Sequence, residues 1–269
     1  MNLSISNIAW NPKEDESIIG ILNTLGIKGL EIAPTKIWRA PLDTSRIEVE
    51  KVKQRWAIKG FELIAMQSLL FGQNQFNLFS KDSREEMFIY LSGIIKLAGQ
   101  LGVKSLVFGS PKNRFAGDLS KNEQFEIALP FFYELGNEAT KNNVVFCIEP
   151  NPVQYNCDFI TNTKDAVSLI REVGNPGFKL HLDSGAMFLN EENILISIEE
   201  GIPFLNHFHI SEPYLNLIGS NATPHAEIAH ALKTLGYSNW VSIEMKDNLL
   251  SNNLESVERA LSYAMTIYN

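Results

Sequence analysis

Two histidines stand two residues apart in an apolar stretch of the chain, residues 204–213. In a β-strand, side chains two positions apart point to the same side, so His207 and His209 would place two imidazoles on one face. Such a pair either binds a metal ion or is satisfied by local hydrogen bonds. The pair alone does not decide between these interpretations, which depend on what other strands bring to the same place.

Three further short apolar segments end in an acid: Glu149, Asp183 and Glu244. If these strands run parallel, their C-terminal ends share one edge, and the acids lie together with His209. Three neighbouring carboxylates repel, and at least one would hold its proton unless a cation is present. Three carboxylates and one imidazole suit Mn²⁺, Mg²⁺ or Co²⁺, with Zn²⁺ as a further candidate. The alternative is that each acid caps a neighbouring helix or pairs with a surface lysine.

The whole chain reads as eight units, each a strand followed by a helix. Strand patterns are predicted at residues 3–8, 29–34, 62–69, 104–109, 144–149, 178–183, 204–210 and 240–244. Helical patterns follow, with start signals such as Ser-x-x-Glu and stops at glycine. This alternation implies parallel pairing, and it predicts one α/β domain, a (β/α)8 TIM barrel spanning residues 1–269. A doubly wound open sheet is the second choice, but no Gly-x-Gly-x-x-Gly follows the first strand.

Composition narrows the class of protein. The net charge is -8 without any block of like charge, which disfavours a nucleic-acid binder. The two cysteines give no disulfide framework, so we expect a reduced, cytoplasmic environment. The first residues do not resemble a signal peptide, and no apolar run is long enough for a membrane span. These features favour a protein that acts on a small molecule, without nucleic acid or membrane.

Five motifs at strand ends carry a family resemblance. They are Gly29-Leu-Glu31-Ile, Cys147-Ile-Glu149-Pro-Asn, His181-Leu-Asp183-Ser-Gly, His207-Phe-His209-Ile-Ser-Glu212 and Trp240-Val-Ser-Ile-Glu244-Met. With them the chain resembles the xylose isomerase-like TIM barrel superfamily of sugar-phosphate isomerases and epimerases, which also contains family 2 apurinic endonucleases. The resemblance covers essentially the whole chain. The motifs are more specific for the superfamily than for one reaction.

The resemblance implies an isomerase or epimerase of carbohydrate metabolism that acts on a keto-sugar or sugar phosphate. Glu149, Asp183, His209 and Glu244 would be the metal ligands. Glu149 and Glu244 would also be the catalytic acid–base pair, moving a proton beside a carbonyl through a metal-stabilised enediolate. Members of the family are commonly dimers or tetramers, so a homodimer or homotetramer is expected.

One position departs from the family pattern. The family usually carries a substrate-binding His three residues after the acid of strand six, where this chain has Ala186. His225 is a candidate replacement, and the alternative is a solvated histidine at a helix start. Further candidates for substrate binding are Glu31, Glu212, Lys246 and Trp10. Lys112 and Arg114 follow strand four and could bind an anionic group, although solvated loop charges are the alternative.

Three other functions stay open. A lyase that dehydrates a keto-cyclitol would use the same enolisation step. A barrel that binds its ligand without turnover is compatible with the change at Ala186. A metal-dependent endonuclease of this fold would need extra histidines on strands two to four, and the chain has none before His181. That gap, with the net charge of -8, makes the endonuclease the weakest alternative.

Overall fold

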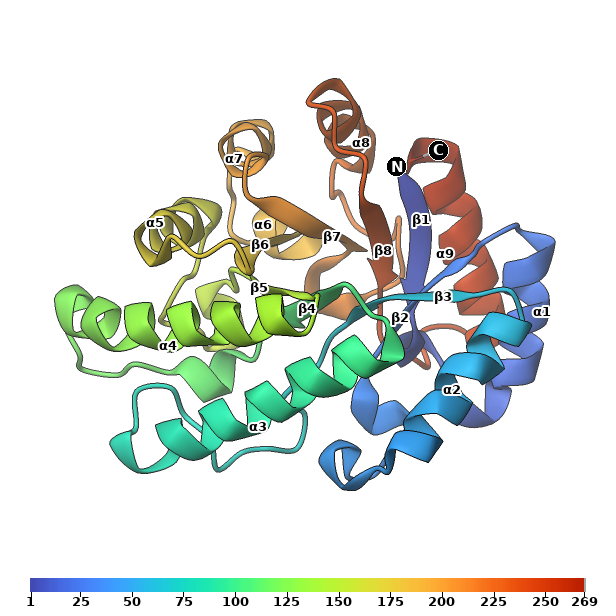
Figure 1. Cartoon of the computed structure of the whole chain (residues 1–269). Coiled ribbons are helices and arrows are strands. Elements are labelled where there is room, and N and C mark those ends of the chain that lie inside the picture. The colour runs from blue at the N-terminus through green and yellow to red at the C-terminus, as the bar shows by residue number, and fades with distance from the viewer. Residues whose placement is uncertain (269) are drawn as a thin grey trace.

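The structure, a computed structural model, describes residues 1–268, and its eight strands form one closed parallel barrel (Figure 1). The strands follow one another in chain order around the barrel, and β8 pairs again with β1. They are β1 (Asn2–Ser6), β2 (Gly29–Ile32), β3 (Glu62–Met66), β4 (Ser105–Phe108), β5 (Val145–Ile148), β6 (Phe178–Asp183), β7 (Leu205–Ser211) and β8 (Trp240–Glu244). The predicted (β/α)8 barrel is therefore confirmed.

Helices surround the barrel on the outside (Figure 1). They are α1 (Asp15–Thr24), α2 (Arg46–Ile58), α3 (Lys81–Leu101), α4 (Lys121–Lys141), α5 (Thr163–Val173), α6 (Ser184–Leu189), α7 (Ile194–Gly201), α8 (His225–Thr234) and α9 (Asn253–Tyr268). The capping box predicted before α4 is present, because Ser120 accepts from the Glu123 backbone and the Glu123 carboxylate accepts from Ser120. Pro130 lies inside α4, which continues past it without a restart.

Aromatic packing fixes α4 against the middle strands of the barrel. Phe132 of α4 stacks on Phe178 of β6, with ring centres 4.8 Å apart. The same ring meets Phe108 of β4 edge-on at 5.8 Å, and Phe108 in turn contacts Phe146 of β5 at 5.6 Å. Each such pair contributes roughly 0.5–1.5 kcal/mol beyond the burial of its area. These contacts hold together β4, β5 and β6, two of which lead into the predicted site.

The inside of the barrel carries many polar side chains, whereas the strand faces that pack against the helices are hydrophobic. Fully or almost fully buried polar side chains on the strands include Ser4, Ser6, Glu31, His181, His207, His209 and Ser242. Ser4 donates to the carbonyl of Val241 at 3.1 Å, and Gln67, just beyond β3, donates to Ser6 at 2.9 Å. Buried polar groups are normally paired in this way, so any unpaired group in this interior needs an explanation.

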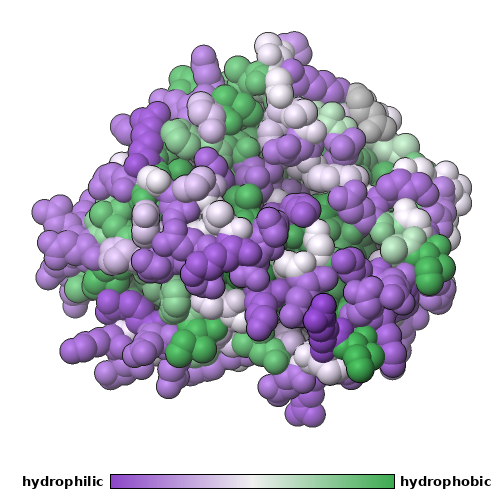
Figure 2. All heavy atoms as spheres, in the orientation of Figure 1, coloured by the Kyte–Doolittle hydropathy of each residue, from purple (hydrophilic) through white to green (hydrophobic). Residues whose placement is uncertain are grey.

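The outer surface is mainly polar. Figure 2 shows hydrophilic side chains over most of the visible face, with hydrophobic residues in small separate groups. Across residues 1–268, every helix is too short or too polar to cross a lipid bilayer.

Candidate active site

The four predicted metal ligands converge where β5, β6, β7 and β8 end. One ligand atom from each of Glu149, Asp183, His209 and Glu244 lies within 4.8 Å of the others. Nδ1 of His209 is 3.2 Å from Glu244, 3.9 Å from Asp183 and 4.0 Å from Glu149. Parallel pairing produces this arrangement, because the register places Asp183 beside His209. The strand ends therefore meet as the sequence indicates.

Asp183 has a divided role. Its Oδ1 accepts a hydrogen bond of 2.6 Å from the backbone of Ala186 and so caps α6. This cap explains why the short helix α6 begins directly after β6. The second oxygen, Oδ2, is buried without a hydrogen-bond partner among residues 1–268, and so is Nδ1 of His209. Unpaired buried atoms of this kind are rare, and a cation between them would satisfy both.

Glu31 holds His209 from behind. Its carboxylate oxygens lie 3.1 and 3.0 Å from Nε2 of His209, and one is also 3.3 Å from Nε2 of His207. Burial alone would raise the pKa of Glu31, but the charges of His209 and His207 lower it, so the carboxylate is ionised. The expected substrate contact needs correction, because Glu31 is fully buried and its oxygens are directed at imidazoles. It lies below the rim and orients the ring that presents Nδ1 to the acids.

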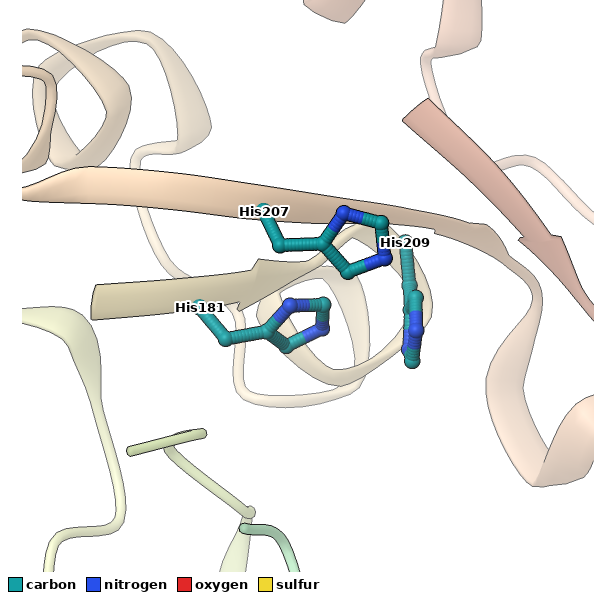
Figure 3. A group of neighbouring side chains, drawn as sticks. All are labelled: His181, His207 and His209. Carbon is teal, nitrogen blue, oxygen red and sulfur yellow. The ribbon is translucent and has the colours of Figure 1, made fainter. Parts of the chain in front are cut away.

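Three imidazoles from β6 and β7 lie next to one another (Figure 3). His181 comes from β6 and His207 and His209 from β7, with the rings of His181 and His209 4.0 Å apart. Burial and the two neighbouring imidazoles lower the pKa of His181 well below its usual value, so it is neutral. These three nitrogens could also hold a metal, but all three residues are buried. The side chains of Glu149 and Glu244 keep 13% and 12% exposure, so solvent reaches the group of carboxylates.

The acids strongly perturb one another. Burial, and then the charges of Glu244 and Asp183, raise the pKa of Glu149 to about 8. Burial, and then Glu244, raise the pKa of Asp183 to about 6. Burial would lower the pKa of His209, but the charges of Glu31 and Glu244 outweigh it and raise that pKa. Without a cation, one acid therefore holds a proton at neutral pH, in agreement with the argument from repulsion.

A cavity of about 130 Å³ opens beside Glu149 and Glu244. The other residues that line it are Gln67, Ser68, Val107, Gly109 and Ser110. A Cβ on Gly109 would lie 2.2 Å from Oε2 of Glu149, so only glycine leaves room for this carboxylate. Ser68 and Ser110 have φ of 54° and 41°, a conformation that is uncommon for non-glycine residues and is enriched at functional sites. The sequence analysis missed this wall, although its residues directly follow the third and fourth strands.

Two tyrosines join neighbouring loops close to the acids. The backbone of Tyr214, after β7, donates to the hydroxyl of Tyr155, after β5, at 2.9 Å, and the two rings meet edge-on at 5.6 Å. Burial, together with the nearby charges of Asp183 and Glu149, raises the pKa of Tyr155 to about 12. Its hydroxyl therefore stays protonated beside the site. The sequence analysis missed this pair, because nothing in the sequence links the two loops.

A model of the xylose isomerase-like TIM barrel family matches residues 19–265. The chain belongs to this family. D-psicose 3-epimerase of Enterocloster bolteae is 30% identical to it over 87 residues, which cover 32% of this chain and 29% of that protein. The chain thus matches less than a third of the length of that relative.

Solved structures resemble this xylose isomerase-like barrel over its full length. D-psicose 3-epimerase from Clostridium cellulolyticum H10, solved with D-tagatose, superposes with a TM-score of 0.83, 20% identity and complete coverage of both chains. An L-ribulose 3-epimerase superposes with a TM-score of 0.85 and 17% identity, covering 100% of this chain and 95% of the other. At these identities the likeness supports the fold.

Two predicted substrate contacts of this xylose isomerase-like barrel need correction. The carboxylate of Glu212 accepts from the backbone of Gly219 at 2.8 Å and from Thr223 at 2.5 Å, and it lies 3.2 Å from Nε2 of His225. Nδ1 of His225 lies 2.9 Å from the hydroxyl of Tyr268. Both side chains are buried and fully engaged, so neither is available to a substrate. Glu212 follows His209, the predicted ligand, by an odd number of residues, which directs it away from the barrel interior.

Trp10 also lies elsewhere than expected, whereas Lys246 stays a candidate. Trp10 is 1% exposed, packs in the hydrophobic core and donates from Nε1 to Asp15 at 2.9 Å. Its ring therefore has no free face for a sugar. The side chain of Lys246 is exposed, and its backbone donates to the carbonyl of Leu215 at 3.0 Å. Contact between its amine and a substrate stays a prediction.

Proposed function

We propose that this protein is a metal-dependent isomerase or epimerase of keto-sugars. The observation that carries the proposal is the convergence of three carboxylates and one imidazole, in which Asp183 Oδ2 and His209 Nδ1 are buried and make no hydrogen bond within residues 1–268. The matched relative and the superposed structures are keto-sugar 3-epimerases, which supports this class of reaction. The site residues themselves indicate why such a reaction suits the geometry.

One divalent cation fits the residues present. Glu149, Asp183, His209 and Glu244 would hold it, and an oxygen-rich set with a single nitrogen suits Mn²⁺, Mg²⁺ or Co²⁺, with Zn²⁺ as a further candidate. When bound, the cation would polarise a substrate carbonyl and acidify the proton on the neighbouring carbon. Glu31 acts behind the ligands, because an acid on the far nitrogen of a ligand histidine fixes the orientation of the ring.

The proton transfer falls to Glu149 and Glu244, which both line the cavity. One carboxylate would remove the proton from the carbon beside the carbonyl and leave an enediolate. The other would return a proton on the opposite face of that carbon and so invert its configuration. In the metal-free site the pKa of Glu149 is raised to about 8, and a bound cation would lower it and leave the carboxylate ionised to act as a base.

Substrate hydroxyl groups would meet polar atoms of the cavity wall. Gln67, Ser68 and Ser110 line the cavity and can each form hydrogen bonds with a sugar. Ala186 leaves no imidazole at the position where the family usually has one. We propose that this wall, together with Lys246, binds a small carbohydrate.

Solvent-deuterium exchange tests the proposal directly. The protein is loaded with Mn²⁺ and incubated in D₂O with D-psicose, D-tagatose, D-fructose or L-ribulose, and deuterium at carbon 3 is measured by mass spectrometry. We expect incorporation by the wild type and none by Glu244→Gln. Glu62→Gln is the matched control, since Glu62 is exposed at the opposite end of a strand. A protein without affinity for divalent cations, or exchange that persists in Glu244→Gln, would refute the proposal.

A further inference from the structure

Arg114 is a buried cation without an acidic partner. It lies in the loop between β4 and α4, is 0% exposed, and forms no ion pair with an acid of residues 1–268. Its Nε and Nη1 have no hydrogen-bond partner among these residues. The guanidinium lies 5.8 Å from the ring centre of Phe108. An arginine in such a setting is unfavourable unless something nearby offsets its charge.

The one side-chain hydrogen bond that Arg114 makes within residues 1–268 leads directly to the active site. Nη2 donates to the main-chain carbonyl of Glu149 at 2.7 Å. Asn151 also donates to this carbonyl, but at 3.4 Å, and the amide of Glu149 bonds to Phe108 at 3.1 Å. β5 ends at Ile148, one residue earlier, so Arg114 provides the shortest contact to the carbonyl of Glu149 beyond the regular strand.

The charge of Arg114 also suits its location. Three carboxylates around one divalent cation leave a surplus of negative charge, and Glu31 adds to it from below. The guanidinium contacts the main chain of Glu149, and a positive charge at this position opposes part of the surplus. Since the side chain is fully buried, it acts from behind the ligands and offers no surface to a substrate.

We propose that Arg114 is a positioning residue for Glu149, which fixes the main chain of this ligand and offsets the surplus negative charge of the site. This inference rests on the proposed role of Glu149 as metal ligand and base. Loss of Arg114 then weakens metal binding and slows turnover without weakening substrate binding.

The test compares two arginines that each donate to a loop carbonyl. Arg114→Met removes the contact at Glu149, and Arg84→Met removes a matched contact of 2.9 Å with the carbonyl of Leu78, in the loop after β3. We expect Arg114→Met to weaken Mn²⁺ binding by about 10–100-fold in calorimetry and to lower kcat by a similar factor, with KM unchanged. Arg114→Lys should recover part of both, and Arg84→Met should match the wild type in both.

The outcomes separate the two proposals. If Arg114→Met fails to fold by circular dichroism, Arg114→Gln replaces it with the same expectation. Equal Mn²⁺ affinity and kcat in the Arg114 and Arg84 variants would overturn the positioning role while leaving the proposed function intact. A rise in KM alone would overturn it too, because it would place Arg114 against the substrate. A wild type that binds no Mn²⁺ would overturn the proposed function and this inference together.

Discussion

Two pairs of glutamate and histidine lie near the end of β7, and they differ in how completely their atoms are used. In the Glu212–His225 network, both ring nitrogens of the histidine have partners, and the carboxylate also accepts from Gly219 and Thr223. In the active site, Nε2 of His209 is held by Glu31, whereas its Nδ1 lies 3.2 Å from Glu244 without a hydrogen bond, and Oδ2 of Asp183 has no hydrogen-bond partner among residues 1–268.

This difference distinguishes a structural network from a site for a ligand. A buried network with every atom satisfied stabilises one arrangement of its loops. A buried atom left unpaired destabilises the protein by about 1–3 kcal/mol, so it persists where a ligand completes it. Both histidines are buried and both face glutamates, so burial and residue type alone do not separate them. The number of buried atoms without a hydrogen bond separates the two regions.

Loss of the acid behind His209 should have the largest effect. In Glu31→Gln, a neutral amide replaces the carboxylate that holds Nε2, so the ring is oriented less firmly and is a weaker ligand. We expect Mn²⁺ binding to weaken by about 10–100-fold in calorimetry, with little change in the fold. The matched change in the satisfied network, Glu212→Gln, should leave the Mn²⁺ affinity of the folded protein unchanged. Equal affinities in wild type and Glu31→Gln would contradict the comparison.

The contributions of the two regions to the free energy of unfolding should change with pH in opposite directions. The pKa of Glu149 is raised from 4.5 to about 8, so the metal-free folded state keeps a proton that the unfolded chain releases. Its contribution to the free energy of unfolding therefore falls as pH rises from about 5 to 8. Hydrogen bonds from His225 and Thr223 outweigh burial and lower the pKa of Glu212, so its contribution is lost as pH falls below 4.5.

The pH dependence of metal binding offers a way to measure the raised pKa of Glu149. A proton on Glu149 competes with the cation, so Mn²⁺ affinity should rise with pH between 6 and 8 by up to about tenfold per unit, and then level off. Calorimetry in buffers of different ionisation enthalpy should detect release of a proton on binding. Affinity that stays constant across this range would contradict the shifted pKa.

The smallest effect should come from removing one hydrogen bond of the Glu212–His225 network. Thr223→Val keeps the side-chain shape but removes the hydroxyl that donates to Glu212. We expect a loss of about 1 kcal/mol in the free energy of unfolding, measured with urea, because the carboxylate keeps its other two partners. Mn²⁺ affinity should not change. A drop in metal affinity would show that the network and the site are coupled.

Much of the fold and the group of proposed ligands could be predicted from the sequence. β6 and β8 begin and end at the predicted residues, and Glu149, Asp183, His209 and Glu244 meet as expected. The reason is physical. The C-terminal ends of parallel strands in a barrel lie at one rim, so an acid at a strand end can be placed at that rim from the sequence.

The residues whose roles were predicted wrongly owe their positions to contacts between segments that are far apart in the sequence. Glu31 is at a strand end, but its depth follows from two histidines about 180 positions later. His225 looked like a surface helix start, and it is buried because Tyr268 lies over it. Arg114 looked like a solvated loop charge, and its burial depends on the loop after β5. Such tertiary contacts produce no local periodicity in the sequence from which they could be predicted.

The pairing of β1 with β8 has a consequence for biosynthesis. It joins the segment that begins at Asn2 to the segment that begins at Trp240, so the barrel closes only after β8 has left the ribosome. Until then the nascent sheet has two open edges, which can pair with other chains, and a chaperone that covers them would raise the yield of folded protein. Glu244 arrives with this last strand. The complete set of proposed ligands therefore exists only after β8 has been translated.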